Sequence, residues 1–130
     1  YYGAAWVSDV NNRFNNLVLI SMQGHVANTL YREDRAEASM RVFGHLDLGL
    51  RAQLIQMNGP QEQYVATAGW EFDAKRSLTG RLVKNGKDIN SYIAYRSSGF
   101  AGNELFVIFG DPNARKSRAR IGLKFVMPIN

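Results

Sequence analysis

The sequence predicts an all-β fold, an antiparallel up-and-down transmembrane β-barrel or the C-terminal part of one. Two observations lead to this prediction. Apolar and polar side chains alternate with a period of two along most of the chain, and turn-forming residues interrupt the alternation at short intervals. No long segment has the 3.6-residue periodicity of a helix. We expect about ten strands in one domain that covers residues 1–130.

The clearest alternation begins at Arg35 and continues, with turns, through the second half of the chain. The four longest apolar sets are Ala36, Ala38, Met40 and Val42; Leu48, Leu50, Ala52 and Leu54; Tyr64, Ala66, Ala68, Trp70 and Phe72; and Ala119, Ile121, Leu123 and Phe125. Each set lies on one face of a predicted strand, because successive side chains of a strand point to opposite faces. The last of these strands is expected over Ser117–Met127.

Shorter strands are expected between these segments, at Tyr2–Ser8, Leu17–Gln23, Val26–Arg32, Leu78–Lys84, Ile89–Arg96 and Glu104–Gly110. Their boundaries are residues typical of turns. The expected breaks are Asn11-Asn12, Glu33-Asp34, Gly44, Asn58-Gly59-Pro60, Asp73–Arg76, Asn85-Gly86, Ser97–Gly102 and Asp111–Lys116. The pair Glu33-Asp34, between Arg32 and Arg35, is interpreted as a solvated turn.

The composition excludes several classes of function. The absence of cysteine excludes disulfide scaffolds, thiolate catalysis and cysteine-ligated zinc. Only His25 and His45 offer imidazole, and Ser97-Ser98-Gly99 lacks the glycine spacing of a nucleophile elbow. We therefore expect no enzyme activity, no cofactor and no metal. The chain starts at Tyr1 rather than Met, so we expect it to be processed or part of a longer protein.

Period-two alternation suits both a soluble β-barrel and a membrane β-barrel. A soluble barrel turns its apolar face inward, whereas a membrane barrel turns its apolar face outward to lipid. Three features favour the membrane: several segments reach the roughly 9–11 residues that cross a bilayer, charged residues occur in mid-strand, and aromatic residues fall near segment ends. The longest apolar run, Leu105–Phe109, is far shorter than the roughly 20 residues of a membrane helix. A soluble β-barrel that serves as a binding or scaffold module is the open alternative.

A membrane barrel of this kind would present its less apolar face to a polar lumen. The residues expected to line that lumen are Glu37, Arg41, Asp47, Arg51, Glu71, Arg81, Arg118, Arg120 and Lys124. In a soluble barrel the same side chains would be solvated on the outside.

The basic run from Arg115 to Arg120 is the sharpest charge feature of the sequence. Such a run could contact nucleic acid or anionic lipid headgroups. No aromatic residue that could stack on bases is interleaved with it, so we expect no nucleic-acid partner. We interpret the run as a hairpin turn after Asp111-Pro112-Asn113 that leads into a basic strand face.

The order of features from Gln61 onward resembles a known family. The segments that carry the resemblance are Gln63–Phe72, with Gly69 before Trp70; Ser77–Gly86, with Gly80-Arg81-Leu82; Ile89–Tyr95; Leu105–Phe109 with Gly110-Asp111; and Arg120–Phe125. Together they resemble the C-terminal strands of the protein-conducting channel of the mitochondrial outer-membrane translocase, within the eukaryotic porin superfamily. Asn16–Asn58 follows the same order more loosely. The barrels of this superfamily have about 19 strands, roughly twice what this chain supplies.

The resemblance implies a pore in the mitochondrial outer membrane, or alternatively a bacterial outer membrane, that passes unfolded precursor proteins. It implies membrane lipid, other translocase subunits, the precursor proteins and the outer-membrane assembly machinery as partners. In the last strand, Arg120, Gly122, Leu123 and Phe125 match the family's sorting signal. Gly122 would let a neighbouring strand or an assembly factor approach closely. The apparent lumen is rich in arginine, which keeps an anion or metabolite porin of the same superfamily as the alternative.

Overall fold

The structure is a computed structural model that describes residues 2–9, 11–12, 15–99 and 102–128. Within these residues the chain forms nine strands and no α-helix. The strands are β1 (Tyr2–Val7), β2 (Asn16–Val26), β3 (Thr29–Val42), β4 (Leu46–Gln56), β5 (Pro60–Asp73), β6 (Arg76–Asn85), β7 (Asp88–Ser98), β8 (Glu104–Phe109) and β9 (Ile121–Val126). In the described ranges no helix is long and apolar enough to cross a membrane.

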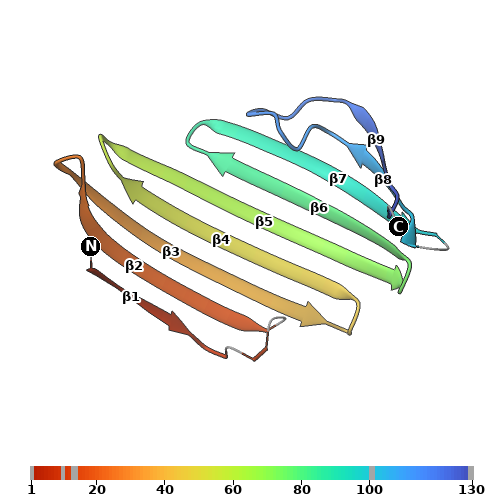
Figure 1. Ribbon diagram of the computed structural model, residues 1–130, viewed down its shortest axis with the longest axis horizontal. Coiled ribbons are helices and arrows are strands. Elements are labelled where there is room, and N and C mark those ends of the chain that lie inside the picture. Colours follow the sequence, from red (N-terminus) through yellow and green to blue (C-terminus); the bar gives the residue numbers. More distant parts are fainter. Residues whose placement is uncertain (1, 10, 13–14, 100–101, 129–130) are drawn as a thin grey trace.

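The strands form one sheet in chain order, from β1 to β9, and every neighbouring pair is antiparallel. Figure 1 shows a single layer with the N-terminus and β9 at opposite edges. The predicted all-β, antiparallel up-and-down fold is therefore confirmed. The sheet is open, with β1 and β9 as its edge strands, as in part of a barrel.

The register gives the sheet one apolar and one polar face. Leu50 pairs with Ala38 and Ala66, and Leu48 pairs with Met40 and Ala68, so these side chains share the apolar face. The alternate positions form the polar face. Because no second layer covers the sheet, Val65 is the only buried apolar side chain in the part of the chain that the structure describes.

The structure corrects the predicted boundary between the third and fourth expected strands, Val26–Arg32 and the strand from Arg35. Glu33-Asp34 is not a turn, because both residues lie inside β3 and pair with Ile55 and Leu54 of β4. The hairpin turn is Ala27-Asn28, whose φ angles of 47° and 65° are those of a two-residue turn. The expected segments Val26–Arg32 and Arg35–Val42 thus belong largely to one strand, and nine strands replace the expected ten.

The last strand is also shorter than predicted. β9 covers Ile121–Val126, whereas residues 117–120 lie in the connection from β8. Ser117 bonds instead to β7: its amide donates to the carbonyl of Ile89 (2.9 Å), and its hydroxyl accepts the amide of Ser91 (2.9 Å). Along β7, pairing with β8 starts only at Ile93. The edge of β7 before Ile93 is therefore free to bond to Ser117.

A glycine at the end of β8 allows a close approach to β7. Gly110 has a φ of 104°, and a Cβ there would lie 2.8 Å from the carbonyl oxygen of Ser91. Gly44 also has a positive φ, of 70°, but a Cβ there would meet nothing within 4 Å. A side chain at Gly110 would therefore meet both a steric clash and backbone strain, whereas a side chain at Gly44 would meet backbone strain alone.

We expect Gly110→Ala to lower the free energy of unfolding by about 3 kcal/mol, because it adds a clash to the strain. Gly44→Ala should cost only about 1 kcal/mol, the strain alone. Equilibrium urea unfolding of the two variants measures both values. Equal losses would contradict the close approach at Gly110.

Candidate functional site

The polar face of the sheet holds most of the charged side chains predicted to line a lumen. Its charged members are Glu33, Arg35, Glu37, Arg41, Asp47, Arg51, Glu71, Arg81, Asp88, Arg96, Glu104 and Lys124, as the ladder register places them. Six are cations and six are carboxylates, so the face as a whole is close to neutral. What the face can do therefore depends on which of these charges are paired.

Arg41 is the centre of the most extensive ion pair network. Its Nε and Nη2 donate to the two carboxylate oxygens of Asp47, both at 2.6 Å, and Nη2 also reaches Oε1 of Glu71 at 3.1 Å. Arg41 is paired with Asp47 in the β3–β4 ladder. Asp47 in turn pairs with Gly69 of β5, two residues before Glu71, so the register brings Glu71 within reach of the guanidinium.

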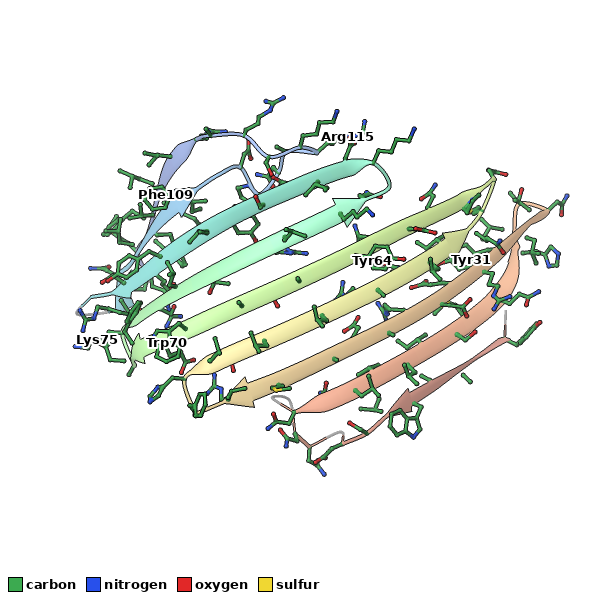
Figure 2. All side chains as sticks on the ribbon, turned by 180° about the vertical axis from the view of Figure 1, so that it is seen from behind. Tyr31, Tyr64, Trp70, Lys75, Phe109 and Arg115 are labelled. Atoms are coloured by element: carbon green, nitrogen blue, oxygen red, sulfur yellow. The ribbon has the colours of Figure 1, made fainter. Side chains whose placement is uncertain are left out.

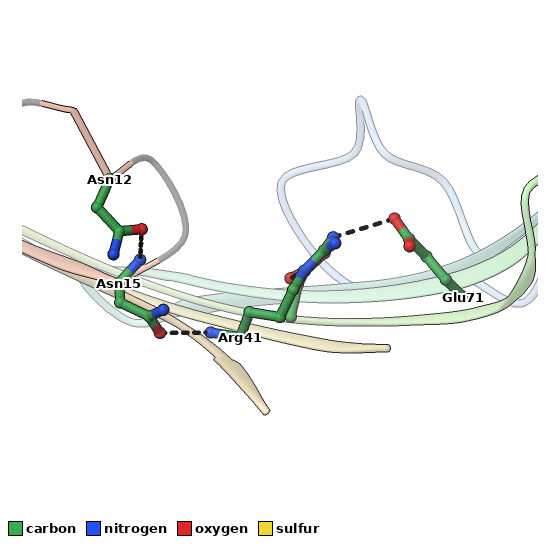
Figure 3. A network of polar contacts seen from close by, with 5 residues as sticks. Asn12, Asn15, Arg41 and Glu71 are labelled. Carbon is green, nitrogen blue, oxygen red and sulfur yellow. Dashed lines mark hydrogen bonds and ion pairs between the residues drawn. The ribbon is translucent and has the colours of Figure 1, made fainter. Parts of the chain in front are cut away.

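The same network extends to the connection between β1 and β2. The amide of Arg41 donates to Oδ1 of Asn15 (2.9 Å), and the amide of Asn15 donates to Oδ1 of Asn12 (3.0 Å) (Figure 3). A charge-assisted, two-pronged bond to a carboxylate is among the stronger polar contacts in proteins. The network therefore ties the end of β3 to β4, β5 and the β1–β2 connection.

Two further clusters follow β3 toward the Ala27-Asn28 turn. Glu37 lies between two guanidinium groups, 3.0 Å from Nε of Arg51 and 3.4 Å from Nε of Arg35. Glu33 is only 8% exposed, and it accepts hydrogen bonds from the hydroxyl of Tyr31 and from Nε2 of Gln53. All six groups are on the polar face because they occupy every second position of β3 and the matching positions of β4.

Two cations of the polar face have no carboxylate partner. Arg96 is paired with Glu104 at 3.6 Å. By contrast, Arg81 and Lys124 form no ion pair with any carboxylate in the described part of the chain. Nζ of Lys124 lies 5.7 Å from the centre of the Phe106 ring. These two side chains are therefore free to attract anions.

Seven of the nine residues predicted to line a lumen share the polar face: Glu37, Arg41, Asp47, Arg51, Glu71, Arg81 and Lys124. The other two, Arg118 and Arg120, lie in the connection before β9 rather than in the strand. Nη1 of Arg120 is 3.3 Å from Oδ2 of Asp111. The β8–β9 connection turns toward β7, so it removes both arginines from the predicted strand.

The sequence prediction missed Glu33, Arg35, Asp88, Arg96 and Glu104 as charged members of the polar face. For the first two the signal was present, since they continue the period-two pattern of Glu37 and Arg41 backward along β3. The supposed turn at Glu33-Asp34 hid this continuation. Four consecutive charged residues resemble a solvated turn in sequence, but alternate members of the run face opposite sides of the sheet.

The proposed sorting signal lies partly on the edge strand β9. Gly122, Leu123 and Phe125 belong to β9, and Arg120 precedes it. Leu123 and Phe125 are on the apolar face and are 74% and 59% exposed. A Cβ on Gly122 would lie 3.9 Å from Cβ of Ile108, an ordinary contact. Pairing with β8 therefore does not require glycine at this position.

Among the described residues no group of three or more His, Asp or Glu side chains is placed to hold a metal ion. No family model matches this chain, and no curated protein or solved structure is significantly similar to it.

We expect a double-mutant cycle on Arg41→Met and Asp47→Leu to give a larger coupling energy than a cycle on Arg76→Met and Asp73→Leu. Arg41 makes two 2.6 Å contacts and its side chain is 21% exposed. The side chains of Arg76 and Asp73 are 57% and 42% exposed, where water screens the pair. Urea unfolding of the single and double variants gives both energies, and a smaller value at Arg41 would contradict the network.

Proposed function

We propose that this chain forms part of the wall of an outer-membrane β-barrel, with its apolar face toward lipid and its polar face toward an aqueous pore. The observation that carries the proposal is the inversion of the two faces. The apolar side chains are exposed, whereas the polar face contains paired charges and the buried carboxylate of Glu33. A sheet that gathers its apolar residues on one face and most of its strand charges on the other suits the wall of a water-filled pore in a membrane.

The exposed apolar side chains indicate how unfavourable it would be for this face to contact water. Leu50, Ile121 and Leu123 are 65%, 70% and 74% exposed. Burying one such side chain completely contributes about 1.5–3 kcal/mol. A contiguous apolar face of this kind is an interaction surface rather than a normal solvated surface. Lipid would recover this free energy along the whole sheet.

The strand lengths and the outward side chains support the same proposal. On β5 the positions of the apolar face from Tyr64 to Trp70 are apolar or aromatic, and Figure 2 shows these two aromatic residues on the strand. Glu62 precedes them in β5, and Asp73 follows them. From Glu62 to Asp73 a strand rises about 37 Å, or about 26 Å across a bilayer at a tilt of about 45°. Known barrels have an apolar band about 25 Å tall, flanked by aromatic residues.

From the sequence resemblance we propose that the molecules that pass through the pore are unfolded precursor proteins crossing the mitochondrial outer membrane. The mechanism needs no chemistry, because a polar wall shields the moving chain from lipid. Other translocase subunits would be neighbours in the membrane. The exposed edge of β9 would be recognised by the assembly machinery through its backbone, as any free edge strand can be.

An anion or metabolite pore is the second candidate, and the unpaired cations favour it. Arg81 and Lys124 lack carboxylate partners, whereas Asp47, Glu71 and Glu104 on the same face are engaged in ion pairs. Free positive charge along a pore raises the local concentration of anions. This candidate shares the membrane architecture with the first and differs only in what passes.

We expect Leu50→Lys to lower the free energy of unfolding by about 2–4 kcal/mol in phospholipid vesicles, the cost of a lysine at mid-bilayer. Thr67→Lys, at a polar-face position of the neighbouring strand, should have a much smaller effect. Reversible urea unfolding from vesicles measures both. If the face met water, lysine in place of the 65% exposed Leu50 would be harmless. That result, or loss of the protein from membranes on carbonate extraction, would favour the soluble module.

We expect a barrel that contains this chain to conduct ions in planar bilayers, with Arg81→Glu and Lys124→Glu shifting the reversal potential toward cation preference. Lys75→Glu, in the turn between β5 and β6, serves as a control with the same change in charge. A basic presequence peptide that blocks the current supports precursor import. Strong anion preference without any block would instead establish the anion pore.

A further inference from the structure

The connection between β8 and β9 folds onto the polar face at one end of the sheet. Its residues Pro112, Ala114 and Arg115 enclose a cavity together with Asn85 and Asn90 of β6 and β7. Asn90 is only 5% exposed, and its Nδ2 donates to the carbonyl of Asp111 at 2.9 Å. The connection therefore covers part of the face that, under the proposed function, lines the pore.

Most of the net positive charge of the chain gathers at this place. Residues 87–88 and 111–120, named here the basic cluster, contain five cations, Lys87, Arg115, Lys116, Arg118 and Arg120, and two carboxylates, Asp88 and Asp111. Their net charge is +3, of +5 for the whole chain. Figure 2 shows Arg115 beside the end of β7.

The basic cluster is held in position by its two carboxylates. Asp88 is 3.1 Å from Nη2 of Arg115 and 3.6 Å from Nζ of Lys116, and Asp111 is paired with Arg120. The carboxylates lie beneath the connection, with side chains only 20% and 15% exposed. The side chains of Arg115 and Lys116 extend outward and are 90% and 76% exposed. The anchoring therefore leaves most of each cation's surface open to a ligand.

A hollow of about 610 Å³ opens among these side chains, lined by Asp88, Asp111, Asn113, Ala114, Arg115, Lys116 and Arg118. Arg118 forms no ion pair in the described part of the chain. Three cations around one hollow suit a group with several negative oxygens, because guanidinium and ammonium groups donate short, charge-assisted bonds to phosphate. The two carboxylates of the hollow already have cationic partners.

We propose that the basic cluster is a binding site for phosphate-bearing anionic solutes at one entrance of the pore. The proposal rests on the proposed function, because it assumes that the polar face lines a pore. It adds the ligand class and the place where the ligand enters. Cations at an entrance attract anions from solution and raise their local concentration before they reach Arg81 and Lys124.

Titration of the refolded chain in detergent micelles with inorganic pyrophosphate tests the site. We expect Arg115→Gln combined with Arg118→Gln to weaken binding by at least about tenfold, from the loss of two charge-assisted contacts. Lys116 remains to pair with Asp88 in this variant. Lys75→Gln with Arg76→Gln removes the same charge at the opposite end and should leave binding unchanged. Equal binding by both variants would overturn the proposal.

Planar bilayers distinguish this proposal from the pore itself. Pyrophosphate added to one side should reduce the current more than pyrophosphate on the other side, because the cluster lies at one end of the strands. A current without this asymmetry would overturn the binding site but would still support the pore.

Absence of any current would count against the pore, whereas the micelle titration would still test the binding site. Binding to phosphatidylglycerol vesicles that depends on Arg115 and Arg118, without pyrophosphate binding, would reassign the cluster to lipid headgroups.

Discussion

The apolar face of a single-layer sheet is the constraint on which the rest of this structure depends. Antiparallel pairing from β1 to β9 satisfies the backbone hydrogen bonds within the sheet, so the strands form without a second layer. The side chains are not satisfied in the same way, because Leu50, Ile121 and Leu123 project from a face that nothing in the described chain covers. Something apolar has to meet this face, and a bilayer would meet all of it at once.

On the polar face, by contrast, many charged side chains lie close together. Arg41 with Asp47 and Glu71, and Glu37 with Arg35 and Arg51, neutralise each other across neighbouring strands. Among the described residues this pairing leaves Arg81 and Lys124 as the cations of the face without a carboxylate partner, while the face as a whole stays close to neutral. The basic cluster adds positive charge at one end. The selectivity of a pore built on this face would thus follow from a small number of side chains.

Much of the fold could be predicted from the sequence, and the errors have identifiable physical causes. A strand of period two was recognised wherever apolar and polar residues alternated, as in β4 and β5. The alternation fails around Glu33-Asp34, where both faces carry charge, so the strand was divided there. The turn at Ala27-Asn28 was missed because its positive φ angles come with only one residue, Asn28, that commonly adopts them. Ser117–Arg120 continued the alternation of β9 but pairs differently, because β7 offers a free edge at Ile89.

By itself, the sequence determined the fold class and which side chains share a face, because successive side chains of a strand point to opposite sides whatever the strand pairs with. Only the tertiary structure decided which charges meet. Arg41 reaches Asp47 and Glu71 through the register of three strands. The basic cluster likewise depends on the path of the β8–β9 connection over β7. These contacts join residues distant in sequence, and the spacing of residues along one strand carries no information about the stagger of its neighbours.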